Sequence, residues 1–148
     1  MESIKKVAKK LIPQKYHFDI KLIEMLLTNK LGYLKVAYRH DFMLKAFYAL
    51  HFNRIDGDYA EFGCHSGNTF RLAYQESRRW NVNCKLWAFD SFSGLPAPSG
   101  PKDQHPAWCK GAMNMSVDSF KKICDNYKIP DFHYKIIPGF YKDTLNES

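Results

Sequence analysis

Apolar residues recur with helical spacing through the first third of the chain. In residues 4–12 they fall on one face of a helix, and lysines occupy mostly the opposite face. Two further apolar stretches, 20–27 and 42–52, also favour helices, and Asp41 can cap the second one at its N-terminus. We therefore expect residues 1–55 to form a helical region, either a cap or an oligomer contact, ahead of the first strand.

From residue 56 onward the pattern changes to short apolar runs separated by amphipathic segments. Three runs have the length and composition of buried strands: 59–62, 85–89 and 133–137. Between them, helical spacing predicts one helix over about 68–80 and a second that Ser116 caps and that reaches about residue 127. Strands that alternate with helices indicate an α/β fold with a parallel, Rossmann-like sheet, of which the first three strands are present.

A long proline-rich connection, residues 90–115, follows the second strand. Loops of this length without secondary structure are uncommon and are usually functional or mobile. The sequence stops at residue 148, where a helix should lead into a fourth strand. We expect residues 56–148 to be the first half of a cofactor-binding Rossmann-like domain, truncated from a longer protein. A compact small domain is the alternative.

The charge of the chain is unevenly distributed. Residues 1–55 carry 11 Lys+Arg and 4 Asp+Glu, a net charge of +7, whereas residues 56–148 carry 11 of each and are neutral. The basic N-terminal helix could contact an acidic membrane surface weakly, although a solvated helix face is the simpler interpretation. Aromatic and basic residues do not interleave as they do in RNA-binding motifs, so no nucleic-acid partner is predicted.

The cysteines and the apolar runs restrict the compartment. The four cysteines form no C-x-x-C pair and have no regular spacing, which disfavours a disulfide framework or a zinc site. No apolar stretch approaches the roughly 18 residues of a membrane span, and lysines interrupt the segment that a signal peptide would need. We therefore predict reduced thiols and a cytoplasmic location.

The first strand leads into a G-x-x-x-G loop between Gly63 and Gly67. Glycines allow a sharp turn close to a ligand, and the free N–H groups near Asn68 and Thr69 suit a carboxylate or a phosphate. A dinucleotide fingerprint needs a glycine where His65 stands, so a pyrophosphate ligand is disfavoured. His65 itself is interpreted as lining the cofactor, with a role as general base as the alternative.

Two carboxylates flank this loop. Glu61 precedes it and suits a ligand with an ammonium or sulfonium charge. Asp90 stands at the tip of the second strand, where a carboxylate can accept both hydroxyls of a ribose. Together they favour S-adenosylmethionine as the cofactor. Two simpler interpretations stay open, since Gly67 can permit helix packing and Asp90 can cap a turn.

Three blocks of sequence carry a family resemblance. They are residues 57–63 with 67–69, residues 89–96 (FDSFSGLP) and residues 137–145 (IPGFYKDTL). In this order and at these separations they resemble the macrocin O-methyltransferase family, a class I group that depends on S-adenosylmethionine. The resemblance covers roughly residues 41–145. It departs at His65-Ser66, where many members carry an aromatic or small residue followed by a basic one.

The resemblance implies a role for each block. Glu61, the glycine loop and Thr69 would hold the methionine end of the cofactor. Asp90 and Ser91 would bind the ribose, and Gly139-Phe140 would lie beside the adenine. The full set of implied cofactor-binding residues is Glu61, Gly63, Cys64, His65, Ser66, Gly67, Asn68, Thr69, Asp90, Ser91, Phe92, Gly139 and Phe140. The family's metal ligands and catalytic base lie on and after strand four, so neither is assigned within this chain.

We therefore predict an S-adenosylmethionine-dependent O-methyltransferase whose acceptor is a small-molecule hydroxyl on a sugar or a related natural product. The resemblance also implies that the full-length enzyme uses a divalent metal, such as magnesium, to lower the pKa of that hydroxyl. One alternative is a truncated, non-catalytic cofactor-binding or interaction module, whose exposed first-strand edge would favour a homo-oligomer. An NAD-binding Rossmann domain is a further alternative, which His65 disfavours.

Overall fold

The computed structural model of the chain describes residues 13, 16–106 and 108–145. The helix expected over residues 4–12, and with it the membrane contact, lies outside the described residues. The described chain divides into two compact units. The helical unit holds the residues up to Ile55 together with Gln75–Val82, and the sheet unit holds Asp56–Tyr74 and the residues from Asn83 onward.

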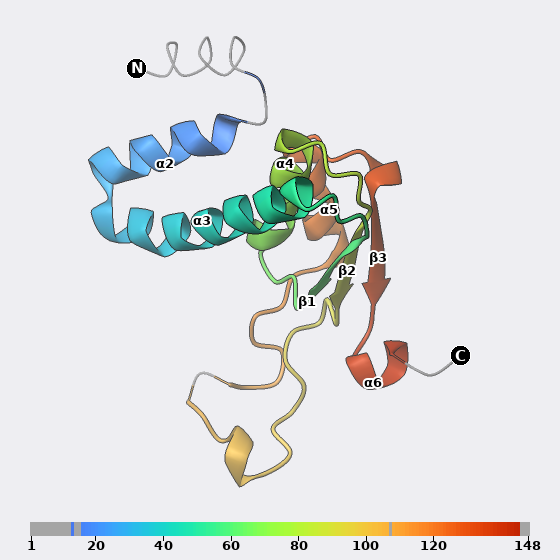
Figure 1. The fold of residues 1–148 in the computed structure, drawn as a ribbon. Coiled ribbons are helices and arrows are strands. Elements are labelled where there is room, and N and C mark those ends of the chain that lie inside the picture. The colour runs from blue at the N-terminus through green and yellow to red at the C-terminus, as the bar shows by residue number, and fades with distance from the viewer. Residues whose placement is uncertain (1–12, 14–15, 107, 146–148) are drawn as a thin grey trace. The chain divides into compact units, whose positions relative to one another are not determined.

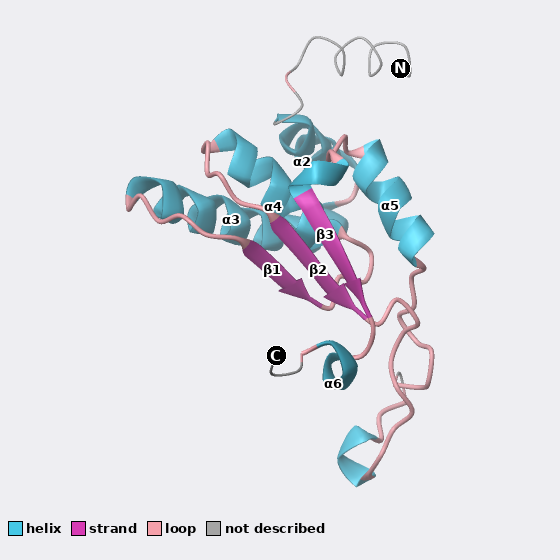
Figure 2. Cartoon of the chain, turned by 90° about the vertical axis from the view of Figure 1, so that its right-hand side faces the viewer, coloured by secondary structure: helices cyan, strands magenta, loops and turns pink. Residues whose placement is uncertain are grey.

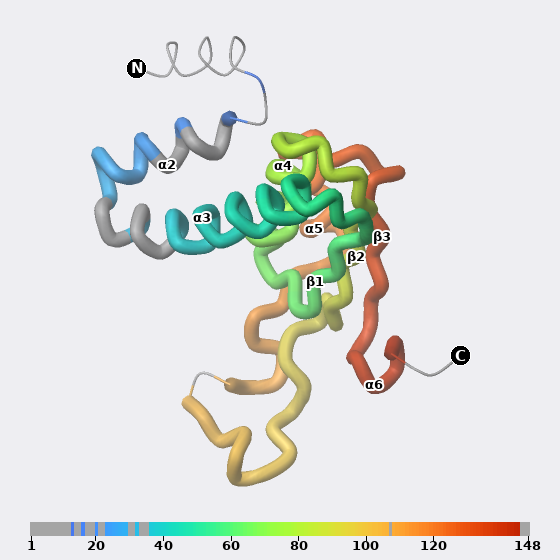
Figure 3. Tube along the Cα trace, viewed as in Figure 1, coloured from blue at the N-terminus to red at the C-terminus, as the bar shows by residue number. Residues whose placement is uncertain are grey.

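Two long helices make up most of the helical unit. α2 (His17–Thr28) and α3 (Lys30–Phe52) run side by side, joined by a sharp turn (Figures 1 and 3). Asn29 stands between them, and its Oδ1 accepts a hydrogen bond from the Gly32 N–H at 2.9 Å. This bond satisfies one of the free N–H groups at the start of α3, so Asn29 is its N-cap.

The predicted N-cap at Asp41 is wrong. α3 has already run from Lys30 when it reaches this position, and the apolar stretch over 42–52 represents only its second half. Asp41 Oδ2 instead pairs with Lys45 Nζ at 2.7 Å, one turn further along the helix. Such i, i+4 pairs on an exposed helix surface contribute a few tenths of a kcal/mol, about 0.3–0.5.

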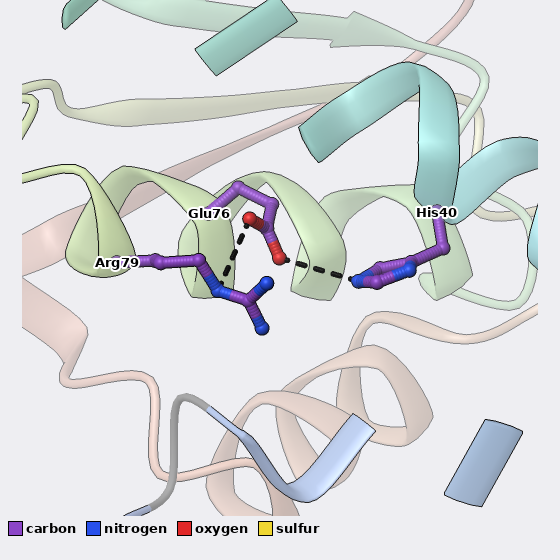
Figure 4. Close-up of polar contacts among 3 residues, drawn as sticks. All are labelled: His40, Glu76 and Arg79. Carbon is purple, nitrogen blue, oxygen red and sulfur yellow. Dashed lines mark ion pairs between the residues drawn. The ribbon is translucent and has the colours of Figure 1, made fainter. Parts of the chain in front are cut away.

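A buried glutamate of the helical unit lies between a histidine and an arginine (Figure 4). Glu76, in the part of α4 (Asn68–Arg79) that belongs to this unit, has no exposed surface. Its Oε1 lies 3.4 Å from His40 Nε2, and its Oε2 lies 3.4 Å from Arg79 Nε. A buried carboxylate is strongly unfavourable without cationic or donor groups beside it, and these two side chains supply them.

The sheet unit contains three parallel strands in the order β1-β2-β3 (Figure 2). They are β1 (Tyr59–Phe62), β2 (Leu86–Asp90) and β3 (Tyr134–Pro138). Glu61 of β1 pairs with Ala88 of β2, which in turn pairs with Ile136 of β3. The predicted α/β class and the parallel sheet are confirmed, and β2 and β3 are each displaced by one residue from their predicted bounds.

One face of this sheet packs against aromatic residues from two helices. Phe70 of α4 and Phe120 of α5 (Val117–Asn126) are fully buried and meet edge to face, with ring centroids 5.1 Å apart. Phe70 also meets Tyr134 of β3 at 6.2 Å, and Leu86 and Ala88 of β2 have no exposed surface. These contacts hold the starts of both helices against the strands.

The start of α5 is as predicted. The Ser116 hydroxyl oxygen accepts a hydrogen bond from the Ser119 N–H at 3.2 Å, which makes Ser116 the N-cap. The helix reaches Asn126, close to the expected end near residue 127. Phe120 and Cys124 form its buried stripe, one turn apart.

The long connection between β2 and α5 is closed at its base by two backbone hydrogen bonds. The Leu95 N–H donates to Ala112 O, and the Gly111 N–H donates to Leu95 O, both at 2.9 Å. Its described residues include a 3-10 turn at Pro101–Asp103 and otherwise form an extended loop beyond the carboxyl ends of the strands (Figure 1). The base of the loop is thus ordered by backbone pairing.

Gly94 is required at this base. Its φ is +85°, and an added Cβ would lie 2.5 Å from the Gly111 carbonyl oxygen and 2.6 Å from that of Ala112. Because backbone atoms cannot move aside cheaply, we expect Gly94→Ala to lower the free energy of unfolding by about 2–3 kcal/mol in urea denaturation. Gly100→Ala is the control, since nothing lies within 4 Å of its added Cβ. Equal losses in both variants would contradict this explanation.

Candidate functional site

The carboxylate of Asp90 holds together the loops at the carboxyl ends of β1 and β2. Its Oδ2 accepts hydrogen bonds from the backbone N–H of Cys64 at 2.7 Å and of His65 at 3.0 Å. Its Oδ1 accepts one from the Phe92 N–H at 2.8 Å. A carboxylate has about four acceptor positions, so about one is left for a ligand in this arrangement. Asp90 therefore does more than cap a turn, and its predicted contact with a ribose stays a prediction.

The glycine loop turns through left-handed backbone conformations. Gly63 has φ of 87°, His65 of 36° and Gly67 of 62°. An added Cβ at position 67 would lie 3.3 Å from Cε2 of Phe120. Gly67 thus permits close packing against α5 as well as the turn, as one of the two sequence interpretations proposed.

Side chains at the start of α4 contact one another. Asn68 Nδ2 donates to the Ser66 hydroxyl, and Asn68 Oδ1 accepts from Arg71 Nη2 at 3.2 Å. The Arg71 guanidinium lies over the Tyr127 ring, 4.6 Å from its centroid. Thr69 is half-buried in the same turn. These contacts fix the helix start, whose first N–H groups lack partners within the helix.

Ser91 and Phe92 shape the turn after β2. The Ser91 hydroxyl donates to Gly94 O at 2.8 Å and accepts from the Ser93 N–H at 3.2 Å. Phe92, with φ of 52°, packs its ring against Phe120, with centroids 5.5 Å apart. Both residues lie at the predicted site, where their side chains stabilise the turn itself. Their contact with a cofactor stays a prediction.

The third sequence block reaches the same place from β3. The Gly139 N–H donates to the backbone carbonyl of Asp90 at 3.0 Å. Gly139 has φ of +141°, and an added Cβ would lie 2.7 Å from Thr144 Cγ2. Phe140 is half-buried and occupies the N-cap position of α6 (Tyr141–Thr144) without a side-chain hydrogen bond. The structure therefore brings all three blocks together at one edge of the sheet.

The electrostatics of this edge favour a positively charged ligand. The pKa of Glu61 is raised to about 7, chiefly by burial and further by the negative charge of Asp90. A hydrogen bond from the Tyr59 hydroxyl to Glu61 Oε2, at 2.8 Å, opposes this shift. Burial also raises the pKa of the Cys64 thiol, with Glu61 and Asp90 adding to the effect. A cation beside these groups would relieve their repulsion.

Three residues at this edge were not singled out from the sequence. Tyr59 lies two positions before Glu61, and this spacing puts both side chains on one face of β1. The spacing is the sequence signal from which their contact could have been predicted. The Met113 carbonyl oxygen lies 3.1 Å from His65 Nδ1. The Tyr141 hydroxyl lies 3.5 Å from the Cβ position of Gly63. The last two contacts join segments that are distant in sequence, and no local pattern indicates them.

No group of three or more His, Cys, Asp or Glu side chains that could hold a metal ion occurs among the described residues.

Within the same residues, no helix is long and apolar enough to cross a membrane. The cysteines are free thiols, of which Cys64, Cys84 and Cys124 are buried and Cys109 is exposed.

The chain is similar to known proteins in its fold and in its sequence. The structure is similar to that of the O-methyltransferase NovP, with a TM-score of 0.60 and 23% sequence identity, over 72% of this chain and 47% of that chain. The similarity establishes the fold, and the chain spans about half the length of NovP. No curated protein matches the sequence. The sequence model of the macrocin-O-methyltransferase (TylF) family matches residues 31–148, which confirms the resemblance, and the chain belongs to this family.

Proposed function

We propose that the sheet unit binds S-adenosylmethionine and that the chain is part of an O-methyltransferase of the natural-product type, acting on a hydroxyl of a sugar or a related compound. Membership of the macrocin-O-methyltransferase family supports the activity. The observation that carries the cofactor assignment is the pair of carboxylates at this loop: Glu61 immediately precedes it, Asp90 binds its backbone N–H groups, and the charge of Asp90 raises the pKa of Glu61.

The charge of the loop fits S-adenosylmethionine better than a dinucleotide. The cofactor carries an ammonium and a sulfonium group, and each would be stabilised near Glu61 and Asp90. The pyrophosphate of NAD would bring negative charge to the same place and would be repelled. His65 also occupies the position where a dinucleotide loop needs glycine.

Each block has a role in this proposal. The Glu61 carboxylate and the helix start near Thr69 receive the methionine end, and the remaining acceptor position of Asp90 takes a ribose hydroxyl. Gly139-Phe140 lie beside the adenine. The bound cofactor supplies the methyl group. The protein contributes by orienting the sulfonium methyl toward the acceptor hydroxyl, which lowers the barrier through positioning.

The described residues are not assigned the binding of a metal ion or the activation of the acceptor hydroxyl. Magnesium is expected from the family resemblance, but the described part of the chain offers no ligand set for it. The described residues therefore account for the cofactor-binding part of the proposal and supply no metal ligands for the methyl transfer. A non-catalytic cofactor-binding module would bind S-adenosylmethionine equally and would differ only in methyl transfer.

Isothermal titration calorimetry distinguishes the candidate cofactors. We expect S-adenosylmethionine and S-adenosylhomocysteine each to bind the chain with one site, and NAD to give no binding heat. Asp56→Asn, an exposed acid in the turn before β1, is the control for nonspecific charge effects and should bind like the wild type. Binding of NAD without binding of S-adenosylmethionine would overturn the cofactor assignment.

A further inference from the structure

Arg71 is a charged side chain buried in α4, one turn beyond the glycine loop. It is 6% exposed, and its guanidinium lies over the Tyr127 ring, 4.6 Å from the ring centroid. Burial lowers the pKa of this group, although an arginine stays protonated in proteins. Burying a cation is costly, and the side chains around Arg71 offset that cost only by contacting it in fixed positions.

Asn68 connects Arg71 to the glycine loop. Its Oδ1 accepts hydrogen bonds from Arg71 Nη2 at 3.2 Å and from Arg71 Nε at 3.4 Å. A guanidinium can only donate, so the amide oxygen must face Arg71 and the amide nitrogen must face away from it. That nitrogen, Nδ2, donates to the Ser66 hydroxyl oxygen. Arg71 thus fixes which end of the Asn68 amide meets Ser66.

The Ser66 hydroxyl is left with one role. Its oxygen accepts from an amide nitrogen that can only donate, so its own hydrogen must be directed elsewhere. Within the described part of the chain, no hydrogen bond has this hydroxyl as its donor. The preceding N–H groups of the loop, those of Cys64 and His65, already bind Asp90. Ser66 therefore offers the loop a donor for a ligand that can accept.

We propose that Arg71 is a positioning residue for the carboxylate of the cofactor and that it acts through Asn68 on the Ser66 hydroxyl, which donates to that carboxylate. The inference rests on the proposed binding of S-adenosylmethionine. The methionine end carries an ammonium and a carboxylate on one carbon, so it needs an acceptor and a donor close together. Glu61, immediately before the loop, suits the ammonium, and Ser66, within the loop, suits the carboxylate.

The same hydrogen bonds offset the negative charge of the loop. The carboxylates of Glu61 and Asp90 would repel the carboxylate of a ligand. The Arg71 cation polarises the Asn68 amide, and through it the Ser66 hydroxyl, in the direction that strengthens donation to an anion. Without this orientation the hydroxyl could also turn and accept, and the loop would favour ligands whose charge is only positive.

Calorimetric affinities for two ligands test this assignment. Decarboxylated S-adenosylmethionine keeps the ammonium and sulfonium groups and lacks only the carboxylate. We expect the wild type to prefer S-adenosylmethionine, and Ser66→Ala to lower this preference by roughly tenfold, the effect of one hydrogen bond to a charged group. Arg71→Met, and Asn68→Ala at an exposed position, should each lower it by about threefold to tenfold, because Ser66 then loses its fixed orientation.

The comparison of two ligands separates positioning from folding. A substitution that only loosens the fold lowers both affinities alike and leaves their ratio unchanged. Arg78→Gln removes an exposed arginine from the same helix and is the control for charge alone, so it should keep the wild-type ratio. Adding Arg71→Met to Asn68→Ala should lower the ratio no further, because Arg71 acts through Asn68.

The possible failures are distinguishable. An unchanged ratio in Arg71→Met and Asn68→Ala, with S-adenosylmethionine still bound, would show that Arg71 is only structural and would leave the proposed function intact. Losses that multiply in the double variant would show that Arg71 acts directly through its charge and not through Asn68. A wild type that binds neither ligand would contradict the proposed function itself.

Discussion

Replacing Glu61 by glutamine is expected to stabilise the ligand-free chain by about 2–3 kcal/mol at pH 8. The pKa of Glu61 is about 7 in the folded protein, against an ordinary value of 4.5, because burial and the charge of Asp90 disfavour its ionised form. The folded state thus holds this proton more tightly than the unfolded state. The free energy of unfolding falls as the pH rises from about 4.5 to about 7 and stays lower above that range. Glutamine is uncharged and keeps an oxygen for the Tyr59 hydroxyl, so the penalty disappears.

Urea denaturation at two pH values measures this gain. The stabilisation by Glu61→Gln should be full at pH 8 and small at pH 5, where the wild-type carboxyl is protonated in the folded state. Asp56→Asn, at an exposed acid, should change stability little at either pH. If Glu61→Gln were less stable than the wild type at pH 8, the Glu61 carboxylate would stabilise the folded state through favourable contacts. That result would contradict the prediction that its buried charge destabilises the folded state.

The same substitution should weaken cofactor binding. A hydrogen bond or ion contact to a charged group contributes about 1.5–3 kcal/mol, so we expect the affinity of Glu61→Gln for S-adenosylmethionine to fall by roughly tenfold to a hundredfold. A residue whose removal stabilises the protein but weakens ligand binding is present for the ligand. The opposite signs separate this account from one in which Glu61 is only structural.

Phe120→Ala is expected to lower the free energy of unfolding by about 3–5 kcal/mol, the largest loss we predict for this chain. The Phe120 ring is fully buried and packs edge to face against Phe70 and Phe92. Its Cε2 atom also lies 3.3 Å from the position that a Cβ would take at Gly67. Truncation removes this apolar area and leaves a cavity that its rigid neighbours cannot fill.

The cavity also lies between two parts of the proposed site. Phe120 contacts the turn that follows Asp90 and the start of α4, so we expect weaker S-adenosylhomocysteine binding as well as lower stability. Phe132→Ala, at an exposed ring, is the matched control and should change stability by less than about 0.5 kcal/mol. A loss below about 1 kcal/mol for Phe120→Ala would show that the core is not organised around this ring.

Local sequence patterns predicted the helices and strands of the sheet unit well. The run Tyr59–Phe62 forms β1 with the predicted bounds, and Ser116 caps α5 as a short polar residue before an amphipathic stretch should. The N-terminus of α3 was not found, because a helix that is apolar on two faces has weak periodicity and Asp41 resembled a cap. Glu76 gave no signal of burial, since the residues that pair with it depend on the tertiary packing of helices.

The acids of the site show where sequence reasoning ends. The position of Asp90 at the tip of β2 follows from the apolar run before it. Its three bonds to backbone N–H groups do not, because two of them come from a loop distant in sequence. The raised pKa of Glu61 likewise depends on burial and on the approach of Asp90, which only the assembled sheet creates. The domain division predicted at residues 55 and 56 remains a prediction.

The pH dependence of S-adenosylmethionine affinity tests the central claim most directly. Calorimetric titration between pH 5.5 and pH 7.0 stays well below the ordinary pKa of an α-amino group, about 7.7–8.0, so the ligand largely keeps its charge. Because Glu61 must lose its proton to bind a cation, the affinity of the wild type should fall by about tenfold per pH unit below pH 7. That of Glu61→Gln should be lower and nearly constant. A wild-type affinity that does not change over this range, or that rises as the pH falls, would contradict the role given to Glu61.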